Sequence, residues 1–179
     1  MNKLIIVLEN INEKVGQFFS WSTTLLVWLI FALVIMRYGF GTFSQKLNEL
    51  CTYLFAISFL FAGGYALKHN MHVRVDLFYA KWSPKGKAWV NLIGGLLFLL
   101  PWSVVSIIVC FRYAYTSFKL GETSQEPSGL AALYVLKFIL LIGFVLLLIQ
   151  GIASILKSTY IILGKDETLL IVKNKKPYE

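Results

Sequence analysis

The stretch AWVNLIGGLLFLLPWSVVSIIVCF, residues Ala88–Phe111, contains no charged side chain over 24 consecutive residues. A helix needs roughly 20 apolar residues to cross the hydrocarbon core of a bilayer, so this stretch is long enough to span a membrane. Three further runs also lack charged residues: Phe18–Met36, Leu50–Leu67 and Phe138–Leu156. A membrane β-barrel would instead show alternating segments of about 10 residues. The sequence therefore predicts an all-α membrane protein with four transmembrane helices.

The composition agrees with this fold class. Of the 179 residues, 58% are hydrophobic and only 15% are charged, whereas a soluble domain carries about 25% charged residues. A chain this short could not bury so much apolar surface in one globular core. We expect a single integral-membrane domain over residues 1–179, with spans near residues 17–37, 44–67, 85–115 and 130–160 and a cytoplasmic tail at residues 165–179.

The basic residues predict the orientation. With these spans, twelve Lys and Arg residues fall on the side of the two termini and the central loop, and four fall on the other side. Because short cytoplasmic loops carry the excess of Lys and Arg, both termini and the central loop should face the cytoplasm. The net charge of +8 follows from this asymmetry and indicates contact with lipid headgroups, not with nucleic acid.

The segment before the first span has a helical apolar pattern. Leu4, Leu8, Ile11 and Val15 share one helical face. This spacing predicts an amphipathic helix over residues 1–14 that lies in the inner headgroup plane. The alternative is that the segment only extends the first span.

Three local signals concern the second and third spans. Gly63-Gly64 should permit close approach of a neighbouring helix. Ser83-Pro84 predicts a helix start, with Ser as the N-cap and Pro in the first turn. Pro101 should kink the third helix, because proline lacks a backbone donor.

Residues that could support catalysis or bind a cofactor are few. His69 and His72 are the only histidines, and neither lies within a span. A bundle-held haem normally needs axial ligands inside the bundle. His69 and His72 with Asp76 could bind a metal in principle, but no Cys or second carboxylate supports such a site. No phosphate loop, nucleophile elbow or zincin motif is present, so we expect no enzyme, no cofactor and no metal.

Six charged residues should lie at one level near the outer face. Glu49 occupies the first turns of the second span, where the helix N-terminus favours a carboxylate. We hypothesise that Glu49 pairs with Arg112 or Lys137, which carry the opposite charge at a similar depth. The full set is Arg37, Glu49, Arg112, Glu122, Glu126 and Lys137.

Cys51 and Cys110 should both lie near the same outer face. The oxidising side of the membrane would allow a disulfide between them. The alternative is that both are small apolar residues with free thiols.

The central loop contains the segment KHNMHVRVDLFY, residues Lys68–Tyr79. His72, Arg74 and Asp76 alternate there with apolar residues, so an extended chain would place the three polar groups on one side. We hypothesise that Arg74 and Asp76 hold this loop against helix ends of the same subunit or a partner. The alternative is a solvated loop on the cytoplasmic side.

Several short segments together resemble the small membrane subunits (DctQ type) of tripartite ATP-independent periplasmic (TRAP) transporters. The resemblance extends over roughly residues 15–160. A first group comes in the family's order: Arg37-Tyr38, Asn48-Glu49-Leu50, Gly63-Gly64, His72-Val73-Arg74-Val75-Asp76-Leu77 and Ser83-Pro84. A second group resembles the stretch before the last helix in one branch of the family: Gly121-Glu122-Thr123-Ser124, Pro127, Gly129-Leu130 and Leu136-Lys137.

The resemblance implies a non-catalytic subunit of the bacterial inner membrane that braces a large permease subunit of the DctM type. A periplasmic binding protein would deliver an organic acid for sodium-coupled uptake. The candidate structural or interaction residues are Glu49, His72, Arg74, Asp76, Arg112, Glu122 and Lys137. The alternative is a self-sufficient four-helix transporter acting as a homo-oligomer, in which Glu49 and Lys137 would be the residues to mutate.

Overall fold

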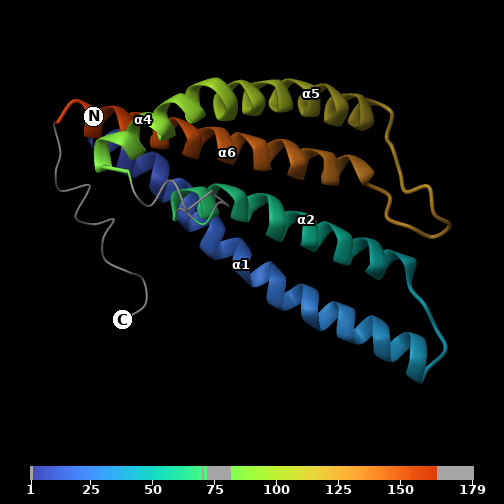
Figure 1. The fold of residues 1–179 in the computed structure, drawn as a ribbon. Helices are drawn as coiled ribbons and strands as arrows, with labels where there is room; N and C mark the ends of the chain where they lie inside the picture. Colours follow the sequence, from blue (N-terminus) through green and yellow to red (C-terminus); the bar gives the residue numbers. More distant parts are fainter. Residues whose placement is uncertain (1, 70, 72–81, 165–179) are drawn as a thin grey trace.

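The computed structural model describes residues 2–69, 71 and 82–164. Every regular element within these residues is helical (Figure 1), and the elements are α1 (Asn2–Gly39), α2 (Gln45–Lys68), α4 (Pro84–Gly94), the π-helical η1 (Gly95–Leu99), α5 (Leu100–Lys119) and α6 (Leu133–Ile162). Since α4, η1 and α5 continue one another, these residues form four long helices, each long and apolar enough to cross a membrane. The predicted all-α fold with four such helices is confirmed for this part of the chain.

Three predicted interaction residues, His72, Arg74 and Asp76, lie outside the described residues. The predicted tail at residues 165–179 lies outside them as well. Their roles therefore stay predictions.

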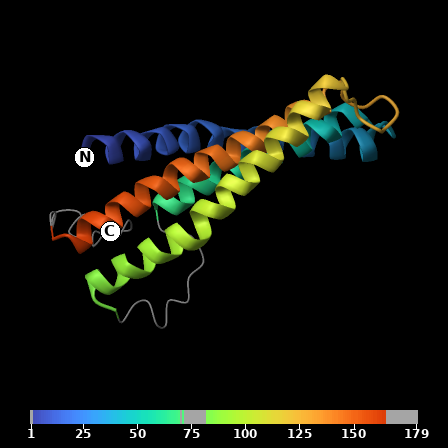
Figure 2. The same cartoon turned by 90° about the horizontal axis from the view of Figure 1, so that it is seen from above.

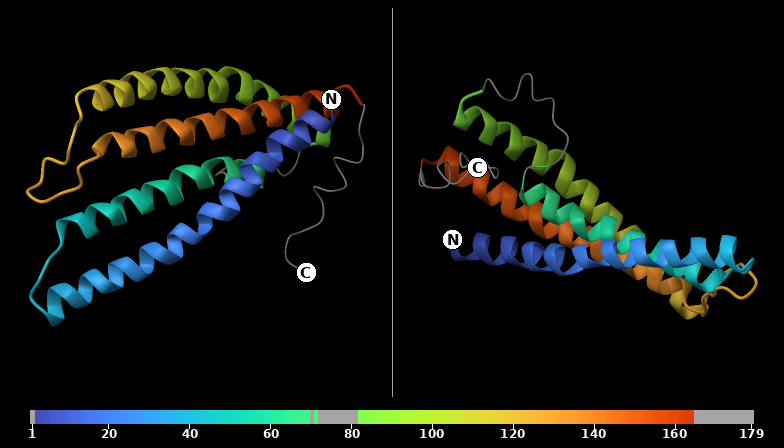
Figure 3. Two further views of the ribbon diagram at one scale, coloured as in Figure 1. Left: turned by 180° about the vertical axis from the view of Figure 1, so that it is seen from behind. Right: turned by 90° about the horizontal axis from the view of Figure 1, so that it is seen from below.

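The four long helices lie side by side in the order α1, α2, α6 and α5 (Figures 1 and 3). The first half of α1 also packs against α6, and α5 packs against α6 at the edge of the layer. Seen from above, the helices overlap near the α5–α6 loop and spread apart toward the other end (Figure 2). This arrangement is a twisted open layer, so most apolar side chains on its two broad faces stay exposed.

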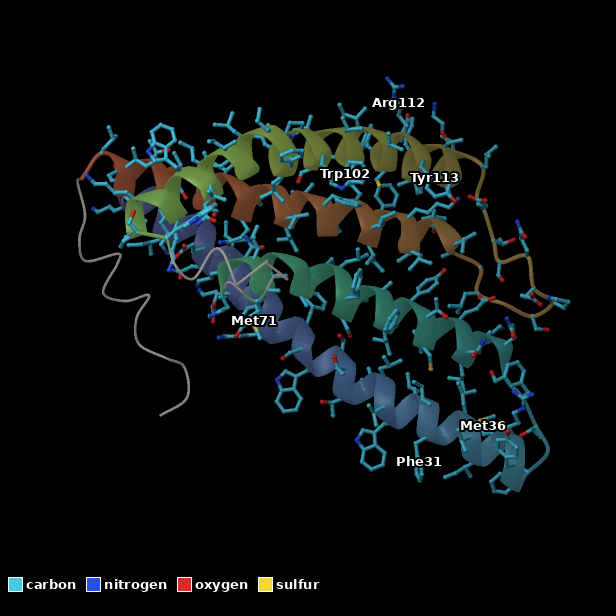
Figure 4. The ribbon with its side chains drawn as sticks, in the orientation of Figure 1. Phe31, Met36, Met71, Trp102, Arg112 and Tyr113 are labelled. Atoms are coloured by element: carbon cyan, nitrogen blue, oxygen red, sulfur yellow. The ribbon has the colours of Figure 1, made fainter. Side chains whose placement is uncertain are left out.

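A small apolar core lies where the inner helices meet. Phe61 of α2 and Ile139 and Leu146 of α6 are buried there, and Phe19 of α1 packs against them. The rings of Phe19 and Phe61 meet edge-on with centroids 4.7 Å apart. Far larger apolar areas face outward, including Phe31 on α1 and Trp102 on α5 (Figure 4).

Only one glycine of the Gly63-Gly64 pair serves a close helix contact. A Cβ added at Gly64 would overlap Asn12 Oδ1 of α1 and lie 3.3 Å from the Leu146 carbonyl oxygen of α6. A Cβ at Gly63 would have no such neighbour within 4 Å. Gly64 is therefore a position at which α1, α2 and α6 pack closely together.

The N-terminal segment differs from the expected surface helix. Helix α1 runs without a break from Asn2 to Gly39, so no separate helix over residues 1–14 is found. Leu4 and Ile11 of the predicted apolar face are 52% and 39% exposed, whereas Ile5 and Asn12 are 3% and 1% exposed. Leu8 and Val15 of the predicted face are half-buried, and Val15 packs on the core. The packed face of α1 therefore overlaps the predicted face only in part.

Ion pairs also hold the start of α1 against the neighbouring helices. Glu9 Oε1 lies 2.9 Å from Lys157 Nζ on α6. Glu13 Oε2 lies 2.9 Å from Lys68 Nζ at the end of α2 and 2.9 Å from His69 Nε2. These polar contacts join the start of α1 to the ends of α2 and α6.

The third long helix begins and bends as its sequence suggests. Ser83 accepts a hydrogen bond from the Gly86 N–H at 3.2 Å, and Pro84 occupies the first turn. Directly before Pro101, the Leu100 N–H donates to the Gly95 carbonyl five residues earlier. Such π-helical turns often accompany kinks, and the helix changes direction between α4 and α5 (Figure 1).

Candidate functional site

The loop between α5 and α6, residues 120–132, is fixed to α2 by one carboxylate. Glu49 Oε1 accepts a hydrogen bond from the Ser124 hydroxyl, and Glu49 Oε2 accepts one from the Leu130 N–H at 2.7 Å. The Ser124 N–H donates in turn to the Leu130 carbonyl at 3.0 Å. One side chain of α2 thus holds the loop at two points, Ser124 and Leu130. We call this contact the Glu49 anchor.

The backbone of the loop is shaped for this anchor. A Cβ added at Gly129 would lie 2.6 Å from Glu49 Oε1 and would overlap the Ser124 side chain. Ser128 has a φ of 63°, in the left-handed region. The Tyr53 hydroxyl of α2 donates to the Ala132 carbonyl at 3.2 Å. The carboxylate therefore reaches the loop only because residue 129 has no side chain.

A second anchor fixes the start of the same loop to α5 and α6. Lys137 of α6 and the Ser117 hydroxyl of α5 both donate to Glu122 Oε2. Lys137 Nζ also lies 3.8 Å from the centroid of the Tyr113 ring, which is labelled in Figure 4. The Leu133 N–H donates to the Glu122 carbonyl at 3.1 Å. We call this group the Glu122 anchor.

The Glu122 anchor favours the charged state of its carboxylate. The hydrogen bond from Lys137 and then that from Ser117 lower the pKa of Glu122 below its ordinary value of 4.5. The Lys137 side chain is only 8% exposed. This burial makes the pairing with Glu122 important, since an unpaired buried ammonium would be costly.

The hypothesised pairing of Glu49 with Arg112 or Lys137 is wrong. Among the described residues, the ion pair within 4 Å that Lys137 makes is with Glu122, and Glu49 and Arg112 make none. The physical reason is the path of the loop, which brings Glu122 back over Lys137 and gives Glu49 two neutral donors. Arg112 is exposed and points away from the other helices (Figure 4).

The two cysteines are both buried and have free thiols. No disulfide joins them, so the alternative prediction, that both are small apolar residues with free thiols, describes this structure. Within the described ranges, no group of three His, Cys, Asp or Glu residues lies close enough together to hold a metal ion.

The structure thus gathers three of the predicted site residues, Glu49, Glu122 and Lys137, at one end of the layer. Their charged atoms make hydrogen bonds within the chain, so the arrangement fixes a loop conformation. The residues Ser117, Ser124 and Tyr113 complete the anchors. Isolated hydroxyl and aromatic residues carry no signal in the sequence that would have identified them.

Comparison with protein families gives a match over most of the chain. The family model described as "Tripartite ATP-independent periplasmic transporters, DctQ component" matches residues 26–159. Neither the curated proteins nor the solved structures contain a match. The matched region includes both anchors and most of the chain, so the chain belongs to the DctQ component family of the tripartite ATP-independent periplasmic transporters.

Proposed function

We propose that this chain is a non-catalytic scaffold that braces the large DctM-type subunit while that subunit carries out sodium-coupled uptake of an organic acid. A periplasmic binding protein would deliver the acid. The family establishes a small membrane subunit of a TRAP transporter, and the role of brace, the coupling ion and the substrate class are our proposal. The alternative of a self-sufficient homo-oligomer is set aside, because members of this family are components of tripartite systems.

The main support for a scaffold role is the distribution of charged side chains along the helices. Each of the four helices contains a charge-free run of 18 or more residues. A site for an organic anion or a cation at membrane depth needs polar or charged groups facing the inside of a bundle. The charged side chains of the described helices lie toward the helix ends, and the buried polar side chains Asn12, Ser103 and Gln150 are neutral. None of these groups supplies a countercharge for an organic anion at membrane depth, so we assign substrate binding to the large subunit.

The open arrangement of the four helices also supports the proposed role as a brace. Four helices side by side leave two broad apolar faces, on which Trp21, Trp28 and Phe31 of α1 are 72%, 65% and 54% exposed. A self-sufficient transporter would be expected to enclose a path between its helices. An open layer is better suited to packing against a larger membrane partner.

We place the start of α1 and the end of α6 in the cytoplasm, and the α5–α6 loop in the periplasm, of a bacterial inner membrane. The Glu9–Lys157 pair brings the start of α1 and the end of α6 to the same end of the layer. The positive-inside rule favours the cytoplasm for that end. In this orientation the two anchors face the compartment of the binding protein.

We further propose that the α5–α6 loop contacts the periplasmic binding protein. Its tip, residues 125–128, is exposed, and the two anchors hold the loop on either side. A loop that is already ordered loses less entropy on association, so it can bind more tightly for the same contact area.

Affinity purification from native membranes tests the proposed brace. The tagged chain, solubilised in mild detergent, should retain a larger multi-span protein in stoichiometric amount, and sodium-dependent uptake should require both proteins. Recovery of this chain alone, or of its homo-oligomer with transport activity in proteoliposomes, would contradict the proposal.

A further inference from the structure

A groove of about 370 Å³ runs between α5 and α6 on the outside of the layer. Its lining atoms are apolar throughout, and its residues are Ile107, Ile108, Phe111, Arg112, Leu141 and Val145. Apart from Arg112, the lining residues carry only hydrocarbon side chains. The groove suits a flexible hydrocarbon chain.

Arg112 lies at the edge of this groove, and its guanidinium makes no ion pair with the described residues. It is exposed, it points away from the other helices (Figure 4), and it has no ion-pair partner within 4 Å among the described residues. The two carboxylates of the anchors, Glu49 and Glu122, are held by the α5–α6 loop and by Lys137. Arg112 is therefore available to an anion from outside the chain.

The position of Arg112 along its helix matches the headgroup level. Lys87 and Arg112 are the charged residues that bracket the 24-residue run Ala88–Phe111. At 1.5 Å per residue this run is about 36 Å long, against roughly 30 Å for the hydrocarbon core. Arg112 thus lies where lipid phosphates lie, and the other groove residues extend from it toward the hydrocarbon.

We propose that the groove and Arg112 form a specific site for a phospholipid of the leaflet on the α5–α6 loop side. One acyl chain lies in the groove, and the phosphate oxygens accept hydrogen bonds from the Arg112 guanidinium. Arginine is suited to this contact because its planar donors match a phosphate in a bidentate way. The combination of an apolar groove and a single cation at phosphate level favours a lipid over a protein segment, for which the groove offers no polar contact.

Native mass spectrometry of the detergent-purified chain, titrated with phosphatidylglycerol, tests this site. The wild type should keep one phospholipid through delipidation, and Arg112→Gln should weaken binding about fivefold or more, the effect of one interfacial cation. Arg112→Lys should lose less, since it keeps the charge. Arg37→Gln is the matched control, because Arg37 is also exposed and contacts the Phe43 ring instead of a groove.

A second pair of variants tests the groove itself. Val145→Trp should fill the groove and reduce lipid retention while Arg112 stays in place. Val135→Trp is its control, since Val135 is 40% exposed on the same helix but lies outside the groove. All variants are compared as monodisperse samples with unchanged helical circular dichroism.

Two results would overturn the proposal. If Arg112→Gln and Val145→Trp both retain phosphatidylglycerol as the wild type does, the bound lipid is only a non-specific annulus. If these variants keep the lipid but lose the large membrane subunit during copurification, the groove is a protein interface.

Discussion

At the scale of single residues, the Glu49 carboxylate orders a loop that begins 70 positions or more further along the chain. It accepts hydrogen bonds from Ser124 and Leu130, which are 75 and 81 residues away in sequence. Glu49→Gln keeps the shape but replaces one acceptor oxygen with a donor, which would face the Leu130 N–H or the Ser124 hydroxyl. We expect faster amide exchange in residues 120–132, with the four helices unchanged.

Hydrogen exchange with mass spectrometry checks this prediction, and Glu126→Gln is the charge-matched control. Glu126 is an exposed carboxylate in the same loop, so its replacement should leave the exchange of the Leu130 amide at the wild-type rate. Equal protection of the loop in wild type and Glu49→Gln would show that the Glu49 anchor does not order it.

The Glu122 anchor should make stability depend on pH. Because the hydrogen bonds from Lys137 and Ser117 lower the pKa of Glu122 from 4.5, folding stabilises the carboxylate form. This contribution is fully present above pH 4.5 and is lost as the pH falls through the lower pKa of the folded state. The Tm difference between wild type and Glu122→Gln should therefore shrink as the pH falls below 4.5.

A double-mutant cycle identifies the partner that causes this pH dependence. In a Lys137→Met background, the further change Glu122→Gln should have a much smaller effect on Tm at neutral pH, because the main hydrogen-bond donor is already gone. Additive effects of the two substitutions would mean that Glu122 and Lys137 act independently.

At the scale of helices, the packing of α1 on α2 and α6 depends on the absence of a side chain at residue 64. Gly64→Ala should cost about 1–3 kcal/mol, the usual range for overpacking, since the added Cβ meets Asn12 and the Leu146 carbonyl. Gly63→Ala is the adjacent control and should stay within about ±0.5 kcal/mol, because it faces open space. Thermal unfolding in detergent measures both, and equal losses would place the close contact elsewhere.

Local patterns in the sequence predicted the helices, but they could not predict the contacts between helices. Long charge-free runs predicted four helices, because each run is a local signal that needs no partner. The packed face of α1 was predicted only in part, and the pairing of Glu9 and Glu13 with Lys157 and Lys68 was not predictable, since these lysines belong to other helices. Likewise the partner of Lys137 depended on the path of the α5–α6 loop, which no local pattern in the sequence encodes.

At the scale of the whole molecule, the central loop is proposed to hold helix ends through Arg74 and Asp76. Arg74→Ala and Asp76→Ala should then each lower the yield of the complex with the large subunit and the rate of uptake by the same factor. Lys85→Ala is the control, because Lys85 is exposed in the first turn of α4, the helix that follows the loop, and its replacement removes a positive charge outside the loop. Unchanged yield and uptake in both loop variants would favour a solvated loop with no role in assembly.

The orientation of the whole layer is testable with single cysteines. Both native thiols are buried, so Cys51 and Cys110 should react little with a membrane-impermeant maleimide. A cysteine at exposed Gln125 in the α5–α6 loop should be labelled in intact spheroplasts. A cysteine at Met71, which is 66% exposed beyond the other end of α2 (Figure 4), should be labelled only after the membrane is permeabilised. The reverse pattern would place the anchored loop in the cytoplasm, where it could not contact a periplasmic binding protein.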